Sequence, residues 1–68
     1  MTDDAIRLGN NLKLIRTEKD ITQIEIAKRL NVDRSFISNI ENGKSNSTLS
    51  TITNLAKVLE VPTSELLK

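Results

Sequence analysis

The chain has 68 residues, ten of them basic and nine acidic, and it contains neither cysteine nor histidine. A chain this short predicts a single domain over residues 1–68 with a small core. Without cysteine or histidine, disulfides, thiol chemistry and zinc sites are excluded, and the net charge of +1 does not by itself indicate a nucleic-acid partner.

The N-terminal segment MTDDAIRL is acidic, whereas a secretory signal has a basic stretch followed by an apolar one. No apolar run approaches the roughly 18 residues that a membrane span requires. We therefore expect a cytoplasmic protein with no membrane partner.

The first predicted helix runs to about Glu18. Its apolar residues recur at spacings of three and four, which places them on one stripe of a helix. These residues are Ala5, Leu8, Leu12 and Ile15. Gly9 lies within the stretch and should weaken the helix by about 1 kcal/mol relative to alanine.

A second helix is predicted to begin at Thr22 and to stop at Asn31. Glu25 follows Thr22 at the spacing of a capping box, and asparagine tolerates the left-handed conformation that ends a helix. After a tight turn, Asp33 is placed as the N-cap of a third helix that ends at Asn42. Two short helices joined by so few residues must cross sharply.

A fourth helix is predicted to begin at Thr48, after a polar turn, and to be followed by a short fifth. The fourth helix carries an apolar stripe of Leu49, Ile52, Leu55, Ala56 and Leu59. Val61 and Pro62 interrupt it, and residues 63–67 can form a last turn or two. With one aromatic residue and few glycines or prolines, the core must consist of aliphatic side chains packed between helices, so the predicted fold class is all-α.

The third helix has two distinct faces. Phe36, Ile37 and Ile40 fall within an arc of about 100°, which we assign to the core. The other side carries Arg34, Ser35, Ser38, Asn39 and Asn42. A solvated face usually carries lysine and glutamate, whereas serine and asparagine disfavour helix interiors but can bond base edges, as arginine can. This composition indicates DNA reading; an ordinary solvated face is the alternative.

The stretch TQIEIAKRLNVDRSFISNIENGK resembles the helix-turn-helix of the lambdoid phage repressor and Cro class. The resemblance extends from about Leu8 to Leu67 and includes Leu8, Leu12, Ile15, Arg16, Thr22, Gln23, Ala27, Val32, Ser35, Ile37, Ile40, Glu41, Gly43, Leu55, Ala56 and Leu59. It implies a compact five-helix bundle of the lambda-repressor-like DNA-binding type. The helix-turn-helix would span about residues 22–42, and the helix over 33–42 would enter the major groove of double-stranded DNA.

By position, the resemblance also implies which residues touch DNA. The base-reading candidates are Arg34, Ser35, Ser38 and Asn39. The candidates for phosphate contacts are Thr22, Gln23, Asn42, Lys44, Asn46 and Ser47. Backbone amides at the start of the second helix suit a phosphate, although a simple N-cap is an equally open interpretation of Thr22.

In the same family, an arginine late in the first helix pairs with the glutamate that ends the recognition helix, which here implies a structural ion pair between Arg16 and Glu41. Loss of either partner should cost several kcal/mol if the pair is buried, but less than about 1 kcal/mol if it is exposed.

The stretch FISNIENGKSNSTLSTITNLAKVLEV resembles the controller proteins of restriction–modification systems, a subgroup of this family. Those proteins typically have tyrosine at the position of Phe36 and arginine at the position of Ser45. The contact that such an arginine makes is therefore in doubt here. A short phage repressor and a generic bacterial regulator stay open as alternatives.

A recognition helix this short reaches only about three or four base pairs, and one copy with so little net charge would bind weakly at physiological salt. Two copies about 34 Å apart would read a two-fold related site, so we predict a homodimer. The predicted contacts are Val61, Leu66 and Leu67, with Ile6 and Val58 as further candidates. The alternative is that these side chains close the base of the bundle.

An enzyme is not expected, because no paired carboxylates, phosphate-binding glycine run or nucleophile motif can be placed. No cofactor, metal or small-molecule ligand is indicated. The competing function is a protein-interaction module, such as an antitoxin or adaptor, because fold does not fix function. DNA binding predicts an affinity that falls steeply with added salt, whereas a hydrophobic protein interface predicts little salt dependence.

Overall fold

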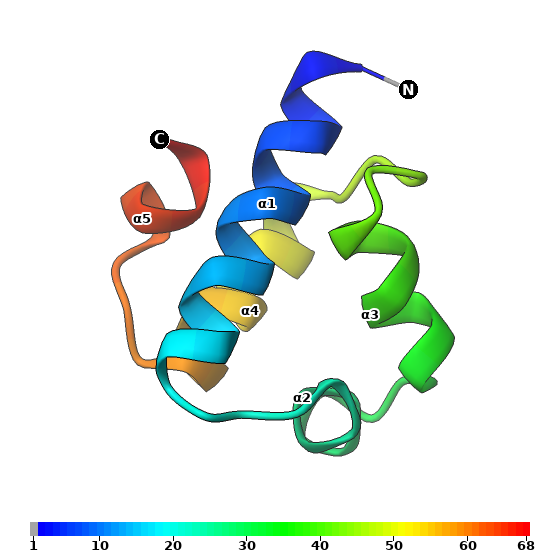
Figure 1. The fold of residues 1–68 in the computed structure, drawn as a ribbon, viewed down its shortest axis with the longest axis vertical. Helices are drawn as coiled ribbons and strands as arrows, with labels where there is room; N and C mark the ends of the chain where they lie inside the picture. The colour runs from blue at the N-terminus through cyan, green and yellow to red at the C-terminus, as the bar shows by residue number, and fades with distance from the viewer. Residues whose placement is uncertain (1) are drawn as a thin grey trace.

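The computed structural model describes residues 2–68, and these residues form five helices and no strand. The helices are α1 (Asp3–Glu18), α2 (Gln23–Leu30), α3 (Arg34–Glu41), α4 (Leu49–Leu59) and α5 (Thr63–Leu67). Figure 1 shows α1 running through the middle of the molecule between α3 and α5, with α2 crossing beyond its C-terminal end. Helix α1 packs against α3 and α5, and α4 packs against α2 and α5. The predicted all-α five-helix bundle is confirmed.

Side-chain caps fix where the helices begin. The Thr22 hydroxyl accepts a hydrogen bond from the Glu25 backbone N–H at 3.1 Å, and Glu25 Oε1 accepts one from the Thr22 backbone N–H at 3.4 Å, so the capping box is complete. Thr48 caps α4 by accepting from the Thr51 backbone N–H at 3.1 Å. Asp33 occupies the N-cap position of α3 with extended backbone, but its side chain makes no capping hydrogen bond.

Left-handed backbone occurs in each of the four turns between the helices. Asn31 ends α2 with φ 59° and ψ 47°, as the sequence predicts. Gly43 follows α3 with φ 70°, and a Cβ placed on it would lie 3.0 Å from Cγ1 of Ile6. Asp20 and Glu60 also adopt positive φ, and neither was predicted.

The core is aliphatic and draws on all five helices. Its buried members are Leu8, Leu12, Ile26, Ala27, Ile37, Ile40, Leu55, Ala56, Leu59 and Leu66. Two side chains that the apolar patterns assigned to the core, Phe36 and Leu49, are instead 41% and 72% exposed. Because Glu41 is also buried, the inner face of α3 is centred nearer Ile37 and leaves Phe36 at its edge. Leu49 is the first residue of α4, where no preceding turn covers it.

Helices α1 and α3 meet backbone to backbone at Gly9. A Cβ placed on Gly9 would lie 2.7 Å from the Glu41 carbonyl oxygen and closer still to that of Ile40. The close approach of the two helices therefore requires a glycine, even though glycine is less favourable than alanine in a helix. Over residues 2–68, no helix combines the length and apolar character needed to cross a membrane.

Candidate nucleic-acid interface

The outer face of α3 is open to solvent. Arg34, Ser35 and Asn39 are exposed and Ser38 is half-buried, while Ile37 and Ile40 on the opposite side of the helix are buried in the core. Helix α3 is thus anchored by its apolar side chains, and the face that was predicted to read bases is exposed except at Ser38.

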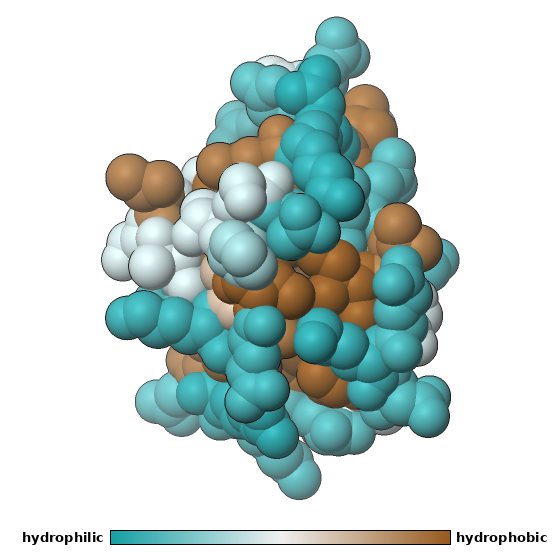
Figure 2. Space-filling model, turned by 90° about the vertical axis from the view of Figure 1, so that its left-hand side faces the viewer, coloured by the Kyte–Doolittle hydropathy of each residue, from teal (hydrophilic) through white to brown (hydrophobic). Residues whose placement is uncertain are grey.

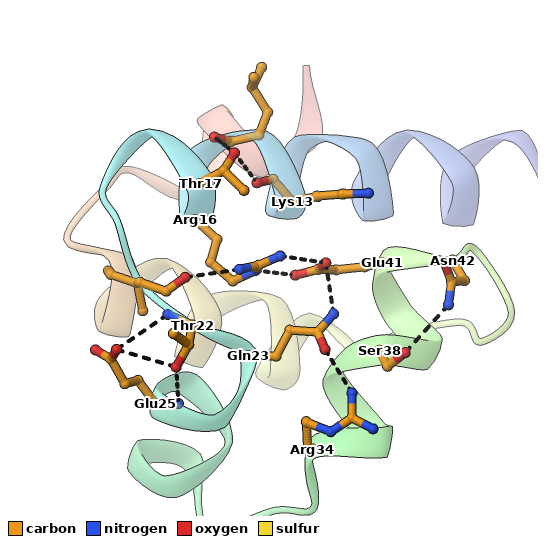
Figure 3. Close-up of polar contacts among 12 residues, drawn as sticks. Lys13, Arg16, Thr17, Thr22, Gln23, Glu25, Arg34, Ser38, Glu41 and Asn42 are labelled. Carbon is orange, nitrogen blue, oxygen red and sulfur yellow. Dashed lines mark hydrogen bonds and ion pairs between the residues drawn. The ribbon is translucent and has the colours of Figure 1, made fainter.

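A chain of polar contacts links three helices behind this face (Figure 3). Arg16 on α1 donates from Nε to Glu41 Oε2 at 2.6 Å and from Nη2 to Glu41 Oε1 at 3.1 Å. Gln23 at the start of α2 donates from Nε2 to the same Glu41 Oε1 at 3.0 Å. Arg34 at the start of α3 then donates from Nη1 to Gln23 Oε1 at 3.1 Å.

Arg16 and Glu41, the residues implied to form a structural ion pair, lie within the protein rather than on its surface. Their side chains are 14% and 3% exposed. Arg16 Nη1 also donates to the Ile21 carbonyl oxygen at 3.0 Å, which ties the pair to the loop before α2. Both carboxylate oxygens of Glu41 accept hydrogen bonds, which compensates for the loss of water around the buried charge. Loss of either partner should therefore cost several kcal/mol of stability, as expected for a buried pair.

Helix α1, the start of α2 and the length of α3 from Arg34 to Asn42 border a shallow hollow of about 510 Å³, which we call the α1–α2–α3 hollow. Its lining includes Lys13, Thr22, Gln23, Ile24, Arg34 and Asn42. Two cationic side chains, Lys13 and Arg34, suit an anion such as a phosphate, and the N-terminal amides of α2 add partial positive charge. Within residues 2–68, no three acidic side chains are grouped so that they could hold a metal ion.

The segment after α3 holds the other predicted phosphate contacts. Lys44, Asn46 and Asn42 are exposed, and Ser47 is half-buried with a hydroxyl that has no hydrogen-bond partner within the described residues. Asn46 Oδ1 accepts a hydrogen bond from Thr2 Oγ1 at 3.3 Å, which ties this segment to the start of α1. The phosphate candidates Thr22, Gln23 and Asn42 therefore line the α1–α2–α3 hollow, and Lys44, Asn46 and Ser47 lie in the segment that follows α3.

The sequence profile of the family described as Helix-turn-helix matches residues 12–66. The chain belongs to this family of DNA-binding transcriptional regulators. It is 42% identical over 67 residues to the control protein C.MunI from Mycoplasma sp., covering 97% of this chain and 90% of that protein.

Two solved structures of controller proteins have the same fold. The restriction–modification controller protein C.AhdI from Aeromonas hydrophila superposes with a TM-score of 0.89 at 32% identity, covering 96% of this chain and 98% of the other. The controller protein C.Esp1396I, solved as a tetramer in complex with its natural 35 base-pair operator, superposes with a TM-score of 0.83 at 32% identity, covering all of both chains.

Sequence reasoning missed two residues at this helix-turn-helix surface. Lys13 and Ile24 line the α1–α2–α3 hollow, yet neither was considered as a contact. Lys13 lies three residues before Arg16 and so on the same side of α1. Since the pairing of Arg16 with Glu41 turns that side toward α3, the spacing to Arg16 was the signal that could have identified Lys13.

The residues predicted for a dimer contact have different environments. The prediction for Leu66 is wrong, because its side chain is completely buried in the core of the helix-turn-helix domain. Leu67 is 50% exposed and borders a hollow of about 500 Å³ between the start of α1 and α5. Val61 is half-buried. On the side of the molecule where α5 lies, Figure 2 shows apolar side chains gathered within a hydrophilic border.

Proposed function

We propose that this protein is a sequence-specific regulator of transcription that binds a two-fold related operator in double-stranded DNA as a homodimer. Residues 1–68 act as a single helix-turn-helix domain, and the helix over 33–42 enters the major groove. The observation that carries this proposal is the open outer face of α3, which is bordered by the α1–α2–α3 hollow and followed by the polar segment that carries Lys44. A helix lying in a groove has a row of phosphates on either side, which is the arrangement that the hollow and this segment suit.

The proposed roles follow from side-chain chemistry. Arg34 bonds a guanine edge through two donors, Asn39 bonds adenine, and Ser35 and Ser38 bond either base. The proposed phosphate contacts are Thr22, Gln23, Asn42, Lys44, Asn46 and Ser47. These contacts set the register of α3 on the duplex but carry no sequence information.

The proposed homodimer uses two apolar side chains at the C-terminal end, the exposed Leu67 and the half-buried Val61, and leaves out Leu66. Two copies double the number of phosphate and base contacts, which a domain with a net charge of +1 requires for useful affinity. The similarity to C.MunI over 97% of this chain, and to a controller protein solved as a tetramer on its operator, supports a controller-type regulator that binds DNA and self-associates.

The test begins with selection of genomic DNA fragments on the purified protein, followed by footprinting of the selected site at two salt concentrations. We expect affinity to fall steeply with salt. Replacement Arg34→Ala should cost about 1–3 kcal/mol and relax preference at one base, whereas Lys44→Ala should weaken binding to all sequences alike. Equal affinity of the wild type and Arg34→Ala for the selected site would contradict the assignment of α3.

Light scattering at micromolar concentration tests the dimer, and a strictly monomeric species even with DNA present would refute it. A protein-interaction role, as in an antitoxin or adaptor, predicts instead a partner complex whose affinity changes little with salt. The salt series therefore separates the two functions.

A further inference from the structure

Both polar atoms of the Gln23 side-chain amide make hydrogen bonds. The two partners, Glu41 and Arg34, allow only one orientation of the amide. Glu41 as a carboxylate can only accept hydrogen bonds, and the guanidinium of Arg34 can only donate them. Gln23 therefore turns Nε2 toward Glu41, at 3.0 Å, and Oε1 toward Arg34, at 3.1 Å. A flipped amide would face donor with donor and acceptor with acceptor, so both bonds would be lost together.

Glu41 is the fixed end of this chain of contacts. Its side chain is 3% exposed, and two hydrogen bonds from Arg16 hold both carboxylate oxygens in place. The other end, Arg34, is exposed at the first turn of α3, where its long side chain has no ion pair within residues 2–68. The guanidinium of Arg34 is held instead by a hydrogen bond to the side-chain amide of Gln23.

From these contacts we infer that Glu41 is a positioning residue for base recognition, in addition to its role in the ion pair with Arg16. Through the amide of Gln23 it sets the orientation of the Arg34 guanidinium before DNA is bound. This inference rests on the proposed function, because it takes Arg34 as the residue that bonds guanine. It also makes the buried ion pair at the end of α1 part of the recognition apparatus.

The physical consequence is preorganisation. An arginine that is free in solution must be immobilised when it bonds a base, and immobilising one such side chain lowers affinity by roughly 2- to 10-fold. Where Gln23 already holds the guanidinium, part of this loss has occurred in the free protein. The gain applies to a site with guanine in the correct place and not to non-specific DNA, so it appears as discrimination between the two.

The test compares Glu41→Gln and Gln23→Met with the wild type. A glutamine at position 41 can donate as well as accept, so it no longer dictates the orientation of Gln23, and a methionine at position 23 cannot accept from Arg34. We expect each replacement to lower the ratio of affinities for the selected site and for the same site with its guanine replaced, by roughly 2- to 10-fold. Lys13→Ala is the matched control on the same hollow and should leave this ratio unchanged.

A double-mutant cycle separates positioning from loss of structure. Glutamine in place of Arg34 can both donate and accept, so the Arg34→Gln variant does not depend on the orientation of Gln23. Glu41→Gln should therefore reduce discrimination when Arg34 is present and leave it unchanged in the Arg34→Gln background. A purely structural role of Glu41 would instead weaken binding to both sites equally in both backgrounds, and that result would overturn the inference.

Side-chain NMR of the free protein gives a readout that does not depend on DNA. The order parameter of the Arg34 Nε–H group should fall in Glu41→Gln and in Gln23→Met, and should be unchanged in Lys13→Ala. Should Glu41→Gln fail to fold, Gln23→Met carries both measurements, because it leaves the ion pair with Arg16 intact. An unchanged order parameter refutes the positioning role of Glu41. A wild type without salt-dependent DNA binding refutes the proposed function instead, and the two failures are distinguishable because the NMR measurement is made without DNA.

Discussion

Replacing Gly9 by alanine tests the close contact on which the placement of α3 depends. The added Cβ would lie 2.7 Å from the Glu41 carbonyl oxygen and closer to that of Ile40, whereas ordinary van der Waals contact begins near 3.4 Å. Both neighbours are backbone atoms and cannot rotate away, so α1 and α3 would have to separate. The last turn of α3, which carries Glu41, would move away from Arg16.

Two opposing effects set the change in the free energy of unfolding that Gly9→Ala causes. Alanine is favoured over glycine in a helix by about 1 kcal/mol, and on this term alone Gly9→Ala would be stabilising. Overpacking against a well-packed neighbour costs typically about 1–3 kcal/mol, and rigid backbone on the opposite side places this contact at the upper end. The net loss is therefore about 2 kcal/mol, which lowers the melting temperature of a domain of this size by roughly 8–16 °C.

Thermal and urea denaturation of Gly9→Ala, followed by far-UV circular dichroism, would measure this loss. Asn10→Ala is the control, because Asn10 is the adjacent, exposed residue of the same helix and should gain a few tenths of a kcal/mol from helix propensity. A Gly9→Ala protein that is as stable as the wild type, or that gains stability as the control does, would refute the close-approach argument.

Three further replacements test the assignments of Lys13, Leu66 and Leu67. Lys13→Ala should weaken binding to all DNA sequences alike and reduce the salt dependence, without changing base preference; a selective loss for the operator would contradict a phosphate contact. Leu66→Ala should lower the free energy of unfolding by about 2–5 kcal/mol, measured by urea denaturation, because this side chain is fully buried. Leu67→Ser should leave the fold intact but weaken the dimer in light scattering, and a stable dimer of Leu67→Ser would remove this residue from the proposed contact.

The helix boundaries could be predicted because the signals that set them are local. Thr22 and Glu25 are three residues apart, and both bonds of their capping box are present. Asn31 takes the left-handed conformation at the residue where the sequence ended α2. Each of these features depends on atoms within one turn of helix, so it can be predicted without knowing how the helices pack together.

Burial at the edges of helices could not be predicted in the same way. Whether Phe36, Leu49 or Leu66 faces the core depends on where neighbouring helices lie, and a single apolar pattern does not contain this information. Gly9 is the clearest case, because sequence reasoning assigned it only a cost in helix propensity. Its purpose becomes evident from the carbonyl groups of α3, which lie more than 30 residues away along the chain.

The candidate site was predictable as a set of residues but not as a network. Sequence reasoning treated Gln23 as a phosphate contact and Glu41 as the partner of Arg16, in two separate roles. The structure has Gln23 bonded to both Glu41 and Arg34, contacts that span 18 and 11 residues and follow from no local spacing rule. The open face of α3 was predicted from its composition. The hydrogen bonds from α1 and α2 that hold α3 could not be predicted, because they depend on how the three helices pack.

Under the proposed function, the weak net charge makes dimerisation a requirement for DNA binding. Since Arg16 is paired with the buried Glu41 and Arg34 is assigned to a base, the phosphate contacts by cations that this proposal counts are those of Lys13 and Lys44. Two neutralised phosphates give a slope of log affinity against log salt of about −2 for one copy, and four give about −4 for a dimer. A titration of the selected operator over a range of salt concentrations distinguishes these values. A slope near −2 with a full two-fold footprint would mean that these lysines do not reach the backbone in both copies, and the arrangement of phosphate contacts on either side of α3 would then be wrong.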